Sequence, residues 1–257
     1  MNPGPGHRPF GPPPWPLLLG EGRALWELGV FLACWPGLRL APRGDGHPVL
    51  LLPGFLMADW HLLPLRAFLQ DRGYAVHGWE AGINRGNWEV IDAHLLPYLW
   101  QLRRRHGRRP SLVGWSMGGM FARELAKRCP DEVRFVITLG SAFTGDPKAS
   151  NVWPLYEQLS GHQASSLQRH GLLREPPPVP STSVFSRVDG INDWRCCVQE
   201  DTPHSENIEV VSSHHGLGHH PAALLAIADR LAQPEGAWRR FVCPPWARPL
   251  FPAPGRP

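Results

Sequence analysis

Short apolar runs alternate with longer segments of helical periodicity along most of this chain. The run Pro48–Pro53 lacks polar alternation, which is typical of a strand covered on both faces. Further strands are predicted over 74–79, 111–113, 133–139, 183–185 and 208–211, and helices over 60–70 (capped by Asp59), 88–106 (kinked at Pro97), 117–127 and 221–231. Repeated strand–helix–strand units join parallel strands by right-handed crossovers. The pattern predicts an α/β fold with a mostly parallel, doubly wound sheet.

The two ends of the chain and one internal segment depart from this pattern. We predict a Pro/Gly-rich arm and an amphipathic helix over 1–39, one α/β domain over 40–235, and a Pro-rich C-terminal tail over 236–257. Residues 141–181 interrupt the strand–helix rhythm without a clear core helix. We interpret them as a short helical lid inserted between two late strands, and an irregular surface insertion is the alternative.

Charge and cysteine content narrow the classes of function. The net charge is +4, and the basic residues form one dense run, 103–109. This run ends a predicted helix, where positive charges complement the helix dipole. No nucleic-acid partner is therefore predicted. The five cysteines lack metal-ligand spacing and favour a reducing compartment. The apolar stretch Leu17–Trp35 contains Glu21, Arg23 and Glu27, which argues against a signal peptide or a membrane span. We predict a cytoplasmic protein, with peripheral membrane contact through the lid or the N-terminal helix as an alternative.

The segment 114–118, Gly-Trp-Ser-Met-Gly, lies between a predicted strand and a predicted helix. A reversal this sharp forces the central Ser116 into a strained backbone conformation, and the flanking glycines remove side chains that would collide. The N–H of Met117 then lies at a helix start, where positive partial charge stabilises an oxyanion. This context predicts that Ser116 is a nucleophile and disfavours a surface serine in a glycine-rich turn.

Residues 40–235 resemble the α/β-hydrolase family, in particular its small bacterial serine esterases and lipases. A second landmark is 52–55, Leu-Pro-Gly-Phe, which matches the family's loop after an early strand. The resemblance implies an oxyanion hole formed by the N–H groups of Phe55 and Met117, with the Phe55 side chain in the acyl pocket. The N–H of Leu56 is the near alternative to that of Phe55.

The resemblance also implies the chain order serine, acid, histidine. His214 lies just beyond the last predicted strand in a Ser-His-x-Gly segment, and His215 is the second choice. Asp189 lies in the loop after the preceding strand, before a glycine and an aliphatic residue, and Asp193 competes with it. The predicted catalytic triad is therefore Ser116, Asp189 and His214.

These residues predict a serine hydrolase that cleaves a carboxylic ester through an acyl-enzyme. Trp115, Trp153 and Phe55 are expected to line an apolar pocket for a small apolar ester or lipid-like substrate. No cofactor and no metal are predicted, because His219 and His220 lack carboxylate or cysteine partners at ligand spacing and suit helix-capping or solvated roles. The alternatives are an acyltransferase or thioesterase with the same triad, and a non-catalytic binding protein. The sequence leaves the acyl length and the oligomeric state open.

Overall fold

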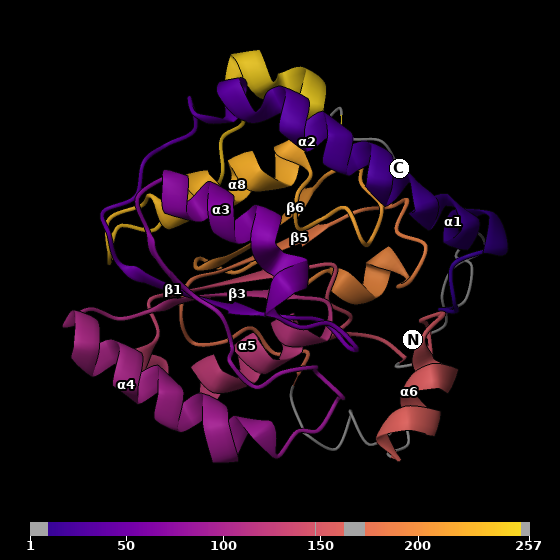
Figure 1. Cartoon of the computed structure of the whole chain (residues 1–257), viewed down its shortest axis with the longest axis horizontal. Coiled ribbons are helices and arrows are strands. Elements are labelled where there is room, and N and C mark those ends of the chain that lie inside the picture. The colour runs from indigo at the N-terminus through magenta and orange to yellow at the C-terminus, as the bar shows by residue number, and fades with distance from the viewer. Residues whose placement is uncertain (1–9, 147, 162–172, 253–257) are drawn as a thin grey trace.

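All six strands of the central sheet run parallel, in the order β2-β1-β3-β4-β5-β6 (Figure 1). The computed structural model describes residues 10–146, 148–161 and 173–252 of the chain, and the sheet lies within them. The strands are β1 (Pro48–Leu52), β2 (Ala75–His77), β3 (Ser111–Trp115), β4 (Phe135–Leu139), β5 (Ser181–Phe185) and β6 (Ser205–Glu209). The predicted α/β class with a parallel sheet is confirmed.

Helices cover both faces of this sheet (Figure 1). On one side lie α2 (Ala24–Leu38), α3 (Leu63–Asp71) and α8 (Pro221–Leu231), and on the other α4 (Leu96–His106) and α5 (Met117–Arg128). Alternate strand residues point to opposite faces. Leu51 and Val113 accordingly join the core on the α8 side, and Leu50 and Leu112 join the core on the α5 side. Both faces are covered, which explains why β1 is apolar throughout and lacks polar alternation.

The N-terminal helices bury carboxylates as well as apolar side chains. A helix α1 (Trp15–Leu19), a 3-10 turn (Gly20–Arg23) and α2 replace the single expected helix. Their carboxylates face the protein, since Glu21 and Glu27 are 8% and 7% exposed, whereas Leu25 and Trp26 are 80% and 75% exposed. The buried carboxylates bind loop N–H groups, as described below, while Phe31 of α2 lies in the core. Within the described residues, no helix is both long and apolar enough to cross a bilayer.

The first predicted helix after β1 begins differently from the expectation. A 3-10 turn over Asp59–Leu62 precedes α3, and the Asp59 side chain does not cap the helix. Its carboxylate instead accepts the backbone N–H groups of Trp79 at 2.9 Å and Glu80 at 3.2 Å. The predicted cap is therefore wrong, because the carboxylate reaches unpaired donors just past β2.

Two further boundaries differ from the prediction. The segment 88–106 contains a π-helical turn (Ile91–Leu95) that runs directly into α4, and Pro97 is the second residue of α4, so the helical geometry changes just before the proline. The last strand begins upstream of the predicted 208–211, at Ser205. Its first three residues are polar, so the apolar run at 208–211 predicted only the final part of the strand.

Described segments on both sides of the predicted 40–235 domain pack onto the sheet. Phe31 of α2 and Ala247 of a 3-10 helix (Pro245–Leu250) belong to the buried core on the α8 side. The predicted boundaries at residues 40 and 235 are not tested by these contacts and stay predictions.

A buried polar cluster lies at the amino ends of β1 and β3. His47 is fully buried, with Nδ1 2.6 Å from Asp45 Oδ1 and Nε2 2.8 Å from Ser111 Oγ. Arg134 donates to the other Asp45 oxygen at 2.8 Å. Burial, together with the nearby Arg134, lowers the pKa of His47 to about 4, so its ring is neutral at pH 7.

We expect His47 to make the fold sensitive to acid. The unfolded chain binds a proton at this residue near pH 6.5, whereas the folded chain binds it only near pH 4. Stability therefore falls as the pH drops through this window, by up to about 3 kcal/mol. The variant His47→Asn should lose less unfolding free energy than wild type between about pH 7 and about pH 4.5 in urea titrations. Equal losses in the two proteins would contradict this.

Candidate active site

Ser116 lies between β3 and α5 in a strained backbone conformation, with φ 53° and ψ −123°. The turn closes only because glycines flank it. A Cβ at Gly114 would lie 2.3 Å from the carbonyl oxygen of Gly118, and one at Gly118 would lie 2.1 Å from that of Leu52. The N–H of Ser116 donates to Leu139 at 2.7 Å, which ties the turn to β4. The segment has the backbone geometry that a nucleophile elbow requires.

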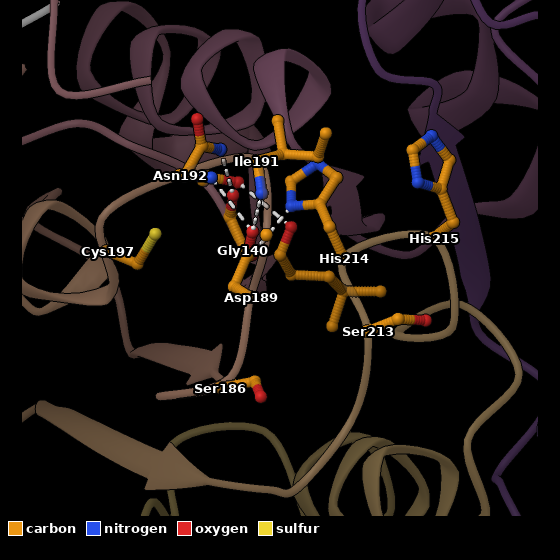
Figure 2. A network of polar contacts seen from close by, with 12 residues as sticks. Gly140, Ser186, Asp189, Ile191, Asn192, Cys197, Ser213, His214 and His215 are labelled. Atoms are coloured by element: carbon orange, nitrogen blue, oxygen red, sulfur yellow. Dashed lines mark hydrogen bonds and ion pairs between the residues drawn. The ribbon is translucent and has the colours of Figure 1, made fainter. Parts of the chain in front are cut away.

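Asp189 and His214 face each other in the loops that follow β5 and β6 (Figure 2). His214 Nδ1 lies 2.7 Å from Asp189 Oδ2, and both residues are 2% exposed. The other oxygen of Asp189 accepts the N–H groups of Ile191 and Asn192, both at 2.8 Å. Burial alone would lower the pKa of His214, but the negative charges of Asp189 and Glu21 raise it above its usual value. Asp189 therefore orients the imidazole of His214 and favours its protonated form.

The two competing residues are engaged elsewhere. Asp193 forms an ion pair with Arg195, 2.5 Å between Oδ2 and Nη2, and its carboxylate caps the 3-10 turn Trp194–Cys197. The His215 side chain is 46% exposed, and its Nδ1 lies 3.0 Å from Glu21 Oε2. Neither residue takes part in the contact between Asp189 and His214.

The serine turn and the histidine loop are joined through Trp115. Its indole N–H donates to the carbonyl oxygen of His214 at 3.0 Å. Among the described residues, no hydrogen bond links Ser116 to His214 directly, and such bonds often tighten only when substrate binds. Gly140, at the end of β4, leaves room for the pair, since a Cβ there would lie 3.1 Å from His214 Nδ1 and 3.2 Å from Asp189 Oδ2.

The loop after β1 distinguishes between the two candidate oxyanion donors. The N–H of Leu56 donates to the carbonyl oxygen of Asn84 at 2.7 Å and is therefore occupied. The N–H of Phe55 makes no hydrogen bond within the described residues, and that of Met117, the first residue of α5, has no intrahelical acceptor. Asn84 also donates from Nδ2 to Pro53 at 2.8 Å. The sequence analysis missed Asn84, because a lone asparagine in a loop forms no pattern.

A pocket of about 500 Å³, its open mouth included, lies above Ser116. Its apolar lining includes Phe55, Met117, Met120, Val152, Trp153 and Tyr156. Tyr156 belongs to α6 (Trp153–Ser160), and its ring packs edge-on against Phe55 with centroids 5.4 Å apart. Trp115, which we predicted to line the pocket, does not. It points to the opposite face of the sheet and packs in the core on the α8 side.

The remaining histidines of the 214–220 cluster have structural contacts. His220 is the N-cap of α8, where its Nδ1 accepts the N–H of Ala222 at 3.3 Å. His219 is buried, and its Nε2 lies 3.1 Å from the carbonyl oxygen of Ala24. Helix capping therefore describes His220, whereas a solvated role for His219 is wrong because α2 covers it.

Ser111, His47 and Asp45 form another hydrogen-bonded set of serine, histidine and aspartate. It lies at the amino ends of the strands, at the end of the sheet opposite to Ser116. Ser111 is fully buried at the start of β3, within a regular strand. Ser116, in contrast, is partly exposed, strained and next to a helix start. Only Ser116 combines access to a pocket with nearby unpaired N–H groups.

Comparisons with known proteins place this geometry in context. No family model matches the chain. It is 26% identical over 117 residues to a pimeloyl-[acyl-carrier protein] methyl ester esterase of Shewanella woodyi, a match covering 46% of this chain and 44% of that protein. It resembles Aspergillus fumigatus lipase B with a TM-score of 0.59 and 16% identity, covering 75% of this chain and 53% of the lipase. For Bacillus licheniformis lipase BlEst2 the TM-score is 0.56 at 15% identity, over 76% and 95% of the two chains. The chain spans about half the length of the first two relatives.

We expect a fluorophosphonate to label Ser116 and not Ser111. Such a reagent bonds covalently to a serine oxygen that a histidine activates. Ser116→Ala should abolish the label, whereas the matched variant Ser111→Ala should retain it, as peptide mass spectrometry would show. A label on Ser111, or undiminished labelling of Ser116→Ala, would contradict the site.

Proposed function

We propose that this chain, which has the α/β-hydrolase fold, is a serine hydrolase that cleaves a carboxylic ester through an acyl-enzyme on Ser116. The observation that carries the proposal is the buried pair of Asp189 and His214, 2.7 Å apart, in loops at the same sheet edge as the strained serine. The curated relative is an esterase, and two of the solved structures with similar folds are lipases, which supports the same chemistry.

Acylation begins when the proton of Ser116 Oγ passes to His214 Nε2 while Oγ bonds to the ester carbonyl carbon. Asp189 keeps a proton on Nδ1 and stabilises the imidazolium that forms. The N–H groups of Phe55 and Met117 bind the oxyanion, and the loss of one such donor costs about 10²–10³-fold in rate. The ester C–O bond then breaks, and His214 returns the proton to the departing alcohol. Water cleaves the acyl-enzyme by the same steps.

The pocket supports a small apolar ester or a lipid-like substrate. Phe55 and Tyr156 form an aromatic wall, and no charged side chain that would bind a polar acyl group is among the described residues that line the pocket. We infer that α6 belongs to a lid over this pocket. Residues 162–172 of the predicted lid lie outside the described residues.

The outward face of the N-terminal helices suits contact with lipid. Trp15, Leu19, Leu25 and Trp26 are between 70% and 80% exposed. Exposed apolar patches of this kind mark interaction surfaces. Reversible membrane contact through this face, and a cytoplasmic location, stay predictions.

The acyl acceptor separates this proposal from its nearest alternatives. An acyltransferase or a thioesterase uses the same serine, acid and histidine, but the former passes the acyl group to an alcohol or a thiol and the latter cleaves a thioester. A binding protein with the same fold would show no turnover. Product analysis with water and with an added alcohol distinguishes these cases.

The first test is hydrolysis of p-nitrophenyl esters of increasing acyl length. We expect wild type to release p-nitrophenol, and Ser116→Ala to lower kcat by on the order of 10⁶-fold, because the acyl-enzyme cannot form. Ser111→Ala is the control and should keep its activity. Equal rates for wild type and Ser116→Ala would overturn the nucleophile. No turnover of any ester or thioester by wild type would favour a binding protein.

The second test compares the two candidate acids. Asp189→Asn should lower kcat by roughly 10⁴-fold, because the imidazole loses its correct tautomer. Asp193→Asn should keep kcat near that of wild type and change stability by less than about 1 kcal/mol, because Asn also caps a helix and only the ion pair with Arg195 is lost. Ester kinetics and thermal unfolding of both variants measure these effects. Loss of turnover in Asp193→Asn alone would show that the acid is misassigned.

A further inference from the structure

We propose that Glu21 and Glu27 of the N-terminal helices are positioning residues that hold the catalytic histidine loop in place. The inference rests on the proposed role of His214 as the general base. Both carboxylates come from a described segment that precedes the first strand and contributes helices, but no strand, to the fold. Both are nevertheless buried against the loops that carry the acid and the histidine.

Three consecutive N–H groups around the base donate to these two carboxylates. The N–H of Ser213 donates to Glu27 Oε1 at 2.9 Å. The N–H of His214 donates to Glu21 Oε1 at 2.9 Å, and that of His215 donates to Glu21 Oε2 at 3.0 Å. Hydrogen bonds to a charged acceptor are about twice as strong as neutral ones, so the backbone on both sides of the base is firmly held.

Glu21 also joins the histidine loop to the acid loop. Its Oε1 accepts the N–H of Gly190 at 2.8 Å, next to Asp189 in sequence. A Cβ at Gly190 would lie 2.3 Å from the carbonyl oxygen of Leu17, so the acid loop packs directly on α1. One carboxylate therefore sets the relative position of the proposed acid and base, which is the geometry that proton transfer depends on.

Glu27 fixes the start of the histidine loop through its second oxygen. Ser213 Oγ donates to Glu27 Oε2 at 2.5 Å, and Ser212 Oγ does so at 3.4 Å. A Cβ at Gly216 would lie 1.7 Å from the same oxygen, so only glycine admits this approach. Arg23 adds a bond from Nη2 to the carbonyl oxygen of Val188, at 2.7 Å.

Glu21 acts on His214 through its charge as well as through its hydrogen bonds. Burial alone would raise the pKa of Glu21, but bonds from His215 and from the N–H groups of His214 and Gly190 hold it at about 2. It is therefore negative at neutral pH and favours the imidazolium of His214. The titratable groups that face His214 are Asp189 in the acid loop, Glu21 in the N-terminal turn and His215 in its own loop, with ring centroids 5.7 Å apart for the two histidines. Figure 2 shows His215 on the side of His214 away from Asp189.

The experiment compares Glu21→Gln, Glu27→Gln and the matched control Glu235→Gln. Glu235 is an exposed carboxylate that pairs with Arg109 at 2.5 Å and lines a hollow with Ser111 at the amino end of β3, whereas these loops follow the carboxyl ends of β5 and β6. With p-nitrophenyl esters we expect Glu21→Gln to lower kcat by up to about 10²-fold with little change in KM, because misplaced groups slow the chemical step. Glu27→Gln should act in the same direction, and the control should match wild type.

The pH profile separates positioning from a purely structural role. Removal of the Glu21 charge lowers the pKa of His214, so the acidic limb of kcat/KM should shift to lower pH in Glu21→Gln. In Glu27→Gln and Glu235→Gln the acidic limb of kcat/KM should shift less than it does in Glu21→Gln. Glu21→Asp keeps the charge but not the reach, so it should retain the wild-type limb while kcat stays reduced.

The outcomes distinguish this inference from the proposed function. If Ser116→Ala hydrolyses esters as wild type does, the proposed function fails. If Ser116→Ala is inactive while Glu21→Gln and Glu27→Gln match the control in kcat and in pH profile, only the positioning inference fails. A loss of kcat in Glu21→Gln that tracks unfolding in circular dichroism, with no shift of the limb, would also overturn it.

Discussion

The close approach of three backbone segments at the carboxyl ends of β1 and β3 is the constraint on which the site depends. Gly118 lies so near the carbonyl oxygen of Leu52 that a Cβ would be 2.1 Å from it, and Gly114 is equally restricted by Gly118. This packing forces the positive φ of Ser116 and brings the start of α5 beside the loop after β1. The strained serine and the two N–H groups of the proposed oxyanion hole, which are unpaired within the described residues, thus share one steric cause.

Buried charge is the second organising feature, and its cost is offset by hydrogen bonds. An ionised carboxylate inside a protein is tolerated only where donors surround it. Glu21 accepts four such bonds, from Gly190, His214 and twice from His215. The same requirement explains the polarity of the N-terminal helices, whose carboxylates face inward while Leu25 and Trp26 face outward. An element outside the sheet thereby becomes part of the histidine environment.

Location within the sheet gives similar side chains different roles. A serine, a histidine and an aspartate are hydrogen-bonded at the amino ends of β1 and β3, and an aspartate and a histidine are bonded near the carboxyl ends. Ligands of parallel sheets bind at the carboxyl ends of strands, where loops diverge and leave a crevice. Ser111 and His47 at the amino ends are fully buried, so we expect this cluster to contribute to stability and its acid dependence rather than to chemistry.

The sequence by itself determined what local patterns encode: the apolar strands, the helices between them, the glycine-flanked Ser116, and the order in which Asp189 and His214 follow it. Helix starts were less well predicted, since Asp59 finds its donors past β2. Tertiary structure decided that Asp189 and not Asp193 contacts His214, that the N–H of Leu56 is occupied, and that Trp115 leaves the pocket. It alone revealed the carboxylate of Glu21, whose partner His214 lies 193 residues away. A pattern within a short window records which way a chain bends, but contacts at such separation exist only once the sheet has brought its loops together.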